Sequence, residues 1–391
     1  MRDATERHDS LDPITVEVVR HKIDGIADEM EETLLRSSFS PIVKEGLDAS
    51  ASLFLPDGST LAQACAIPVH LATLIPAVET MIRRFPVAEM GEGDVYCMND
   101  PYAGGTHLPD FAVIMPVFHQ DRVIALSAAM THHQDVGGMA PGSVPTNATE
   151  IYQEGIRIPA VKLRDGNRFD QTLVEILELN VRMPEVFMGD LNAQIAACTV
   201  GARRLAELAE LNGGNHLKAI FHNLIERSEA MTREALGQLP NGSYRYVDFL
   251  DNDGVELDRR IRIEVEARID DGAIHFDFTG TSPQVKGPLN CVPSGAQAAA
   301  FYAVRAVTDP EIPTNGGCFR PVSLTLPEGT ILNPRPPAAV NARSATIKTT
   351  TNTILGALAQ AVPERMPAMN AGALLVIAFG GQREEGGAFV V

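Results

Sequence analysis

The stretch from Asn99 to His133 constrains the fold of this chain more than any other part of the sequence. It begins with NDPYAGGTHLPD, continues with the apolar runs FAVIMPVF and VIALSAAM on either side of HQDR, and ends with THH. Two β-competent runs around a short polar turn predict an antiparallel hairpin. A turn centred on the QD of HQDR places Asp110 opposite Thr131, within a residue or two.

The predicted hairpin brings three possible metal ligands to its open end. His107 and Asp110 lie at the start of the first strand and His132 lies at the end of the second, so the fold-back gathers two imidazoles and a carboxylate. Such a set, held where strands meet irregular Gly/Pro backbone, suits one divalent ion that keeps coordination positions open. The alternative is that both histidines are ordinary loop or half-buried residues, which is the more common role of a lone histidine.

The composition favours an acidic globular protein without a nucleic-acid or membrane partner. The 391 residues suffice for two or three domains, and 45% of them are hydrophobic. The formal net charge of -18 disfavours nucleic acid and anionic membranes, so the expected partner is a small molecule or a protein. Five scattered cysteines without CxxC spacing, no signal peptide and no apolar run of roughly 20 residues predict a cytoplasmic protein.

Helical periodicity marks much of the N-terminal part of the chain. Asp12 and Pro13 form a helix start, and apolar residues then recur at helical spacing to about Ser38. A second helix is expected at 70–85, where His70 at the helix start is assigned a structural role, and a helical block at 169–236. Between the first two helices, ASLFL, PDGS and TLAQ predict a hairpin whose mouth holds Asp48.

The later part of the chain has a strand-rich pattern. After residue 240, apolar and polar residues alternate with turns at NDG and DDG, which predicts an antiparallel meander. The expected fold is therefore mixed α+β, with antiparallel hairpins and a meander packed against helices and the metal site at loop ends. We expect a site-bearing region at 1–240 and a β-rich region at 241–391 that packs on it.

Two polar stretches and three absent motifs narrow the chemistry. The loop DVGGMAPGS at 135–143 could aim backbone N–H groups at an anion, or could be a plain surface turn. ATEIYQEGIRIPAVKL carries Glu154, which could act as an acid, a base or a clamp, or be a solvated charge. The sequence has no GxxxxGK[ST], strand-linked GxGxxG or GxSxG, which disfavours nucleotide binding and covalent hydrolysis relative to metal-activated water.

The motifs KEGLDAS, NDPYAGGTHLPD, THHQDVGGMAPGS, ATEIYQEGIRIP and GDLNAQIAA together resemble the hydantoinase B/oxoprolinase family. They are long and follow one another in the family's order, so the resemblance covers essentially the whole chain. It implies a subunit that works with a hydantoinase A-type partner, which binds and uses ATP, to open the ring of a hydantoin, of 5-oxoproline or of a lactam. Family members are usually longer, so the resemblance also implies a truncated or split version.

The resemblance implies a site as well. One divalent ion, Zn or Mn, is implied on four ligands: Asp48, His107, Asp110 and His132. Three further residues are implied to orient these ligands or to move a proton: His133, Asp135 and Glu154. Asp48 comes from the resemblance alone, since by its sequence context it is a cap or turn acid. In the implied reaction, the partner phosphorylates the amide oxygen and metal-bound water attacks the activated carbon.

Two other functions remain open at this point. One is the large subunit of an ATP-dependent ketone carboxylase of the acetone type, in which the ion would polarise an enolate or a CO2 derived from carboxyphosphate. The other is a non-catalytic subunit that only docks on a kinase-like partner. In each case the chain is expected to be part of a hetero-oligomer.

Overall fold

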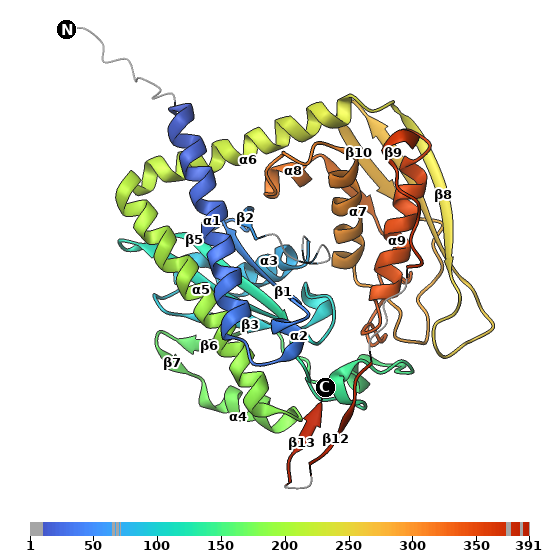
Figure 1. The fold of residues 1–391 in the computed structure, drawn as a ribbon, viewed down its shortest axis with the longest axis horizontal. Helices are drawn as coiled ribbons and strands as arrows, with labels where there is room; N and C mark the ends of the chain where they lie inside the picture. Colours follow the sequence, from blue (N-terminus) through green and yellow to red (C-terminus); the bar gives the residue numbers. More distant parts are fainter. Residues whose placement is uncertain are drawn as a thin grey trace.

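The computed structural model describes residues 11–64, 67, 70, 72–372, 377–383 and 386–390. These residues form two regions, each built on its own sheet, and the long helix α6 (Gly214–Gly237) runs from one region to the other (Figure 1). The predicted boundary near residue 240 falls between α6 and the first strand of the second sheet. Within the described ranges, no helix is long and apolar enough to cross a membrane.

The first region is organised around an antiparallel sheet. In the described part of the chain this sheet has seven strands in the order β2-β1-β5-β4-β3-β6-β7. Their bounds are β1 (Ala49–Phe54), β2 (Thr60–Gln63), β3 (Val95–Met98), β4 (Asp110–His119), β5 (Arg122–His132), β6 (Val161–Asp165) and β7 (Arg168–Phe169). Most of β4 and β5 is buried without alternation, which explains why both sequences are apolar runs and requires that both faces of the sheet be covered.

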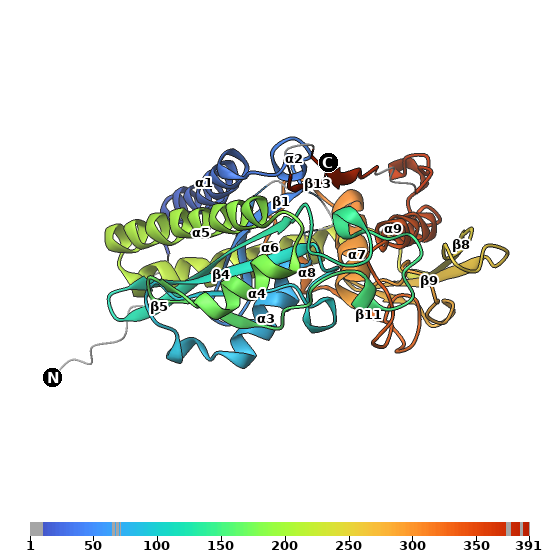
Figure 2. The same cartoon turned by 90° about the horizontal axis from the view of Figure 1, so that it is seen from below.

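Helices cover both faces of this sheet (Figure 2). On one face lie α1 (Pro13–Ser37) and α5 (Pro184–Asn212), and on the other lies α3 (Leu74–Arg84). The first helix starts as predicted, because the Asp12 carboxylate accepts a hydrogen bond from the Thr15 N–H at 2.9 Å. The remaining helices of this region are α2 (Pro41–Lys44) and α4 (Gln171–Asn180), with short 3-10 turns η2 (Val87–Glu89), η3 (Pro101–Ala103), η4 (Pro141–Ser143) and η5 (Ile151–Gln153).

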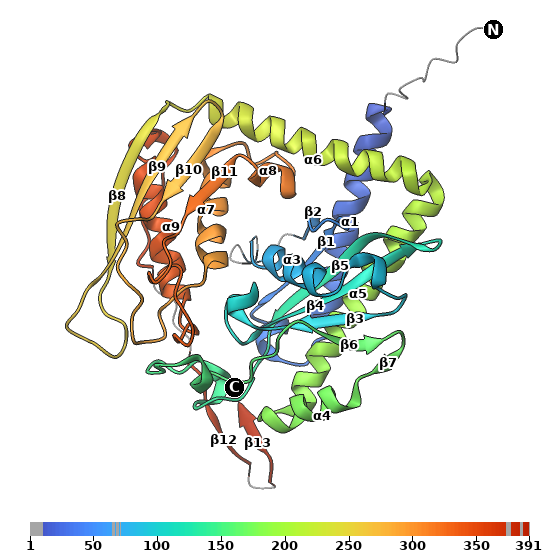
Figure 3. The same cartoon turned by 180° about the vertical axis from the view of Figure 1, so that it is seen from behind.

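The second region has a sheet in the order β11-β10-β9-β8, seen from behind in Figure 3. Its strands are β8 (Gly242–Leu250), β9 (Ile261–Asp270), β10 (Ala273–Asp277) and β11 (Val322–Thr325). The first three form the predicted antiparallel meander, and β11 joins parallel to β10. The inner face packs on α7 (Pro293–Val307) and α9 (Ser344–Leu358); the other elements are α8 (Gly316–Phe319), η6 (Pro363–Arg365), β12 (Gly380–Gln382) and β13 (Ala388–Val390).

The β4–β5 hairpin forms as predicted, but its register differs by one residue. Asp110 lies opposite His132, whereas the sequence placed it opposite Thr131. The reason is a β-bulge at Val117/Phe118, which inserts one extra residue into β5 between the turn and the open end. The mixed α+β class is confirmed, and the shifted register places Asp110 and His132 as direct cross-strand neighbours.

Candidate metal centre

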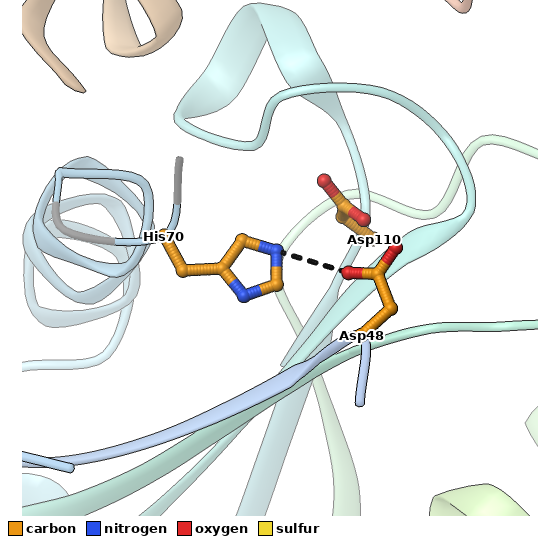
Figure 4. A group of neighbouring side chains, drawn as sticks. All are labelled: Asp48, His70 and Asp110. Carbon is orange, nitrogen blue, oxygen red and sulfur yellow. Dashed lines mark ion pairs between the residues drawn. The ribbon is translucent and has the colours of Figure 1, made fainter. Parts of the chain in front are cut away.

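Three segments that are separate in the sequence meet at the open end of the β4–β5 hairpin. Asp48 immediately precedes β1, and its backbone carbonyl accepts the His132 N–H at 3.1 Å because β1 pairs with β5. His70 precedes α3, and its ring faces the Asp48 carboxylate, with 3.6 Å between His70 Nε2 and Asp48 Oδ1 (Figure 4). One ligand atom each from Asp48, His70 and Asp110 lies within 4.8 Å of the others. Asp48 and Asp110 can therefore share one ion, and His70 lies close enough to contact that ion or a molecule bound to it.

His107 contacts the same carboxylate, and its surroundings favour a cation. Its Nδ1 lies 3.2 Å from the Asn341 carbonyl oxygen and its Nε2 lies 3.1 Å from Asp110 Oδ1, so both ring nitrogens face acceptors. Burial, together with the charge of Arg343, lowers the pKa of His107 to about 4. A neutral imidazole carries one proton, so one of these contacts would join two acceptors. A divalent ion between Nε2 and the carboxylate, with Nδ1–H donating to Asn341, removes this conflict.

Other buried ring nitrogens in the cluster are unpaired. Among the described residues, both nitrogens of His70 and Nδ1 of His132 have no hydrogen-bond partner. Leaving a buried polar group unpaired costs about 1–3 kcal/mol, so these ring nitrogens fit a site that binds an ion. The His132 ring also lies edge-on to His107, with 4.9 Å between centroids. Two imidazoles and two carboxylates, from His107, His132, Asp48 and Asp110, are ligand types that zinc and manganese ions accept.

Asp110 is held at the centre by groups from both regions. Its Oδ2 accepts hydrogen bonds from the Thr106 hydroxyl and, at 2.8 Å, from Arg343 Nη2. Burial alone would raise the pKa of Asp110, but the His107 ring and the Arg343 guanidinium hold it well below its usual range. The carboxylate is therefore charged at neutral pH, as a metal ligand must be.

Glu154 is fully buried and binds the segment that supports His107. Its carboxylate accepts the Val340 N–H at 3.0 Å and the Asn341 N–H at 2.9 Å. Burial raises the pKa of Glu154 to about 7, against the lowering effect of these backbone donors. The Asn341 carbonyl in turn contacts His107, so Glu154 is linked to that ring through Asn341.

The raised pKa of Glu154 makes stability depend on pH. Between pH 4.5 and about 7 the folded chain keeps a proton that the unfolded chain has lost, so the free energy of unfolding should fall as pH rises through this window. Glu154→Gln keeps an acceptor for both N–H groups but cannot ionise, so it should remove the fall of up to about 3 kcal/mol that Glu154 contributes across this window. Denaturant titrations at several pH values test it, with the exposed Glu311→Gln as control. A slope that Glu154→Gln leaves unchanged would contradict the assignment.

The other two predicted proton-transfer residues lie behind the cluster. His133 points to the opposite face of the sheet from His132, packs 4.3 Å from the Phe187 ring and contacts Gln194 Oε1 at 3.0 Å. Burial lowers the pKa of its ring. Asp135 accepts four hydrogen bonds, from the backbone N–H groups of Gly137, Gly142 and Arg182 and from Arg182 Nη1. Both side chains thus fix the backbone that follows β5.

The structure places the four predicted ligands near the open end of the hairpin, with two of them in the compact group, and adds residues that the sequence interpretation missed. Among the described residues, ligand atoms of Asp48 and Asp110 lie within 4.8 Å of each other and of His70. His107 is linked to this group through its contact with Asp110, and His132 through its edge-on contact with the His107 ring. His70, which the sequence interpretation made a helix-start residue, lies in the cluster, and Asn341 and Arg343 reach it from the second region. The Asn-Ala-Arg-Ser sequence carries no motif that would identify these two residues.

Comparison with known proteins identifies relatives along the whole chain. A family profile described as Hydantoinase B/oxoprolinase matches residues 12–391. A protein of Pseudomonas sp. (strain NS671), provisionally named as the B component of a D-/L-hydantoinase, is 35% identical over 396 residues, covering 96% of this chain and 66% of its own length. The chain thus spans just under two thirds of that relative.

Two solved structures share the fold. The crystal structure of ATP-dependent caprolactamase from Pseudomonas jessenii is 32% identical with a TM-score of 0.84, and the match covers 91% of this chain and 61% of that one. A nucleotide-free acetone carboxylase has a TM-score of 0.89 over 97% of this chain and 53% of its own. At 20% identity, the second likeness shows the fold alone.

Proposed function

The chain belongs to the hydantoinase B/oxoprolinase family, and from this premise we propose that it is the hydrolytic subunit of an ATP-dependent cyclic amidase. The proposed substrate is a hydantoin, 5-oxoproline or a lactam. The 32% identical structure is described as an ATP-dependent caprolactamase, and this description supports the choice of a cyclic amide. The observation that carries the metal-dependent part is the pair of contacts at His107. Both of its ring nitrogens face acceptor oxygens, and a cation between Nε2 and the Asp110 carboxylate would satisfy both contacts.

The proposed ligands are Asp48, His107, Asp110 and His132. The family resemblance supports this set, and so do the proximity of Asp48 to Asp110, the His107–Asp110 contact and the cross-strand pairing of Asp110 with His132. When bound there, a divalent ion supplies Lewis acidity, which lowers the pKa of a water molecule and polarises a substrate oxygen. Asn341 orients His107, and Glu154 orients Asn341, so the ring is fixed before substrate arrives.

His70 is suited to proton transfer in this proposal. Its ring is 1% exposed, faces Asp48, and has no hydrogen bond to another described residue. A ring nitrogen free of other bonds can carry a proton to the ring nitrogen of the substrate as the C–N bond breaks. We assign positioning roles to His133, Asp135 and Glu154, because hydrogen bonds to the protein already occupy a ring nitrogen of His133 and the oxygens of both carboxylates.

ATP would act through a partner subunit of the hydantoinase A type. The partner transfers the terminal phosphoryl group of ATP to the amide oxygen and releases ADP. One water then adds to the amide carbon, the C–N bond breaks with a proton passing to nitrogen, and an acyl phosphate remains. A second water converts the acyl phosphate to a carboxylate and inorganic phosphate. Activation is needed because an unstrained amide is a poor electrophile.

The division of labour predicts that the chain alone is inactive. Incubated with hydantoins, 5-oxoproline and lactams, with or without ATP, the isolated chain should open no ring, because it carries no phosphate-binding loop. Adding a hydantoinase A-type partner and ATP should start ring opening, with one ADP formed per ring opened. Product analysis by chromatography measures both. Ring opening by the isolated chain without ATP would contradict the proposal.

A further inference from the structure

Arg343 is an unusual residue beside the metal cluster. Across the described ranges it is the only Arg or Lys that is buried, with 5% of its surface exposed. Its guanidinium donates to Asp110 and Thr106 through Nη2, at 2.8 and 3.2 Å, and to the Ser344 hydroxyl through Nη1, at 3.3 Å. Its Nε–H is buried and has no partner among the described residues. A guanidinium has five N–H donors, so Arg343 retains donor capacity that these three contacts do not use.

Two helices begin at the same place. Arg343 is the N-cap of α9, and the described structure provides no side chain that caps the first turn of this helix. Likewise α7 starts without a side-chain cap, and the hydroxyl of Ser294 in its first turn donates to the Gly105 carbonyl in the loop before Asp110, at 2.8 Å. In α7 the Gly295 N–H already donates to the Val292 carbonyl at 3.0 Å, so α9 is the helix whose start is the better candidate for an anion, because first-turn N–H groups and the positive end of the helix dipole favour negative charge.

We propose that Arg343 and the first turn of α9 form an anion subsite that binds the phosphoryl group of the activated substrate. The inference rests on the proposed function, which delivers a substrate with a phosphorylated oxygen to this cluster. A chain of net charge -18 repels such a dianion, so local positive groups are needed where it docks. A planar guanidinium with an unpaired Nε–H, next to helix N–H groups, matches the geometry of phosphate oxygens. Asp48, 27% exposed, marks the side from which solvent reaches the cluster.

Inorganic phosphate is the probe that tests this subsite. Isothermal titration of the full chain, at matched metal content, should show saturable phosphate binding, and Arg343→Gln should weaken it by at least about tenfold because charge-assisted bonds are lost. Arg343→Lys, which keeps the charge but loses the Nε–H and the planar fork, should fall in between. Arg335→Gln is the matched control, since Arg335 is exposed on the same segment and pairs with Glu328.

Each outcome decides the inference. Phosphate affinity that is the same in Arg343→Gln as in the wild type, or no saturable binding by the wild type, overturns it. If Arg343→Gln does not fold, the phosphate affinity of Arg343→Lys is compared with that of the wild type instead, and an unchanged affinity overturns the inference. Hydrogen exchange on the wild type is an independent measurement: phosphate should slow exchange at residues 344–346, and unchanged exchange there contradicts the subsite.

The ring-opening assay separates this inference from the proposed function. A complex that opens rings while phosphate binding is independent of Arg343 leaves the function standing and removes the subsite. A chain that binds phosphate through Arg343, but opens no ring with the partner and ATP, keeps the subsite and removes the function.

Discussion

Replacing Asp110 with asparagine is expected to remove nearly all bound metal and to lower the free energy of unfolding by about 3–5 kcal/mol. The carboxylate contacts His107, and one of its oxygens lies within 4.8 Å of ligand atoms of Asp48 and His70, so Asp110 is the common neighbour of the cluster. It is also the carboxylate partner of Arg343, and the variant leaves that guanidinium buried without a counter-ion. Elemental analysis and denaturant titration in the presence of a chelator measure the two effects separately.

Asp94→Asn is the matched control for this result. Asp94 is as buried as Asp110 and pairs with Lys162 at 2.9 Å, but it precedes β3, away from the cluster. The control should lose stability and keep its metal. If both variants lose metal equally, the loss reflects general destabilisation, and Asp110 is not a ligand.

Asp48→Asn should lower metal affinity by at least about tenfold and shrink the metal-induced rise in melting temperature. Asp48 lies before β1, whereas the other proposed ligands lie at the β4–β5 hairpin. An ion bound by all four ligands therefore links the β1–β2 hairpin to the β4–β5 hairpin. At a hundredfold excess over Kd, such an ion stabilises the fold by about 3 kcal/mol. Asparagine keeps the shape and removes the charge. Melting temperature recorded against metal concentration measures the effect.

The control for Asp48 is Asp57→Asn in the turn of the same hairpin. Asp57 is exposed and only accepts the Ser59 N–H at 2.9 Å, so its melting curves should follow the wild type. If Asp48→Asn also follows the wild type at every metal concentration, Asp48 is the turn acid that its sequence context indicates.

The sequence predicted the elements of the site because their signals are local. The apolar runs of β4 and β5 are long and bounded by turn residues, so the hairpin follows from patterning. Its register was missed by one residue, because nothing in the sequence identifies the bulge at Val117/Phe118. Asp12 and Pro13 likewise gave the start of α1, since a cap and a first-turn proline act within one turn.

The residues that were missed depend on tertiary structure. His70 was assigned to a helix start, whereas α3 begins at Leu74 and the ring turns toward Asp48. Asn341 and Arg343 reach the cluster from more than 200 residues further along the chain, through the packing of the two regions. No periodicity or motif encodes such a contact, because it depends on where the second sheet and α9 dock.

The most direct test of the central claim is the metal content of the purified full chain, measured by elemental analysis for the wild type and for Asp110→Asn. The wild-type chain should bind about one zinc- or manganese-type ion, and the variant less than about a tenth of that. A wild-type chain that binds no divalent ion, or an Asp110→Asn variant with wild-type metal content, would contradict it.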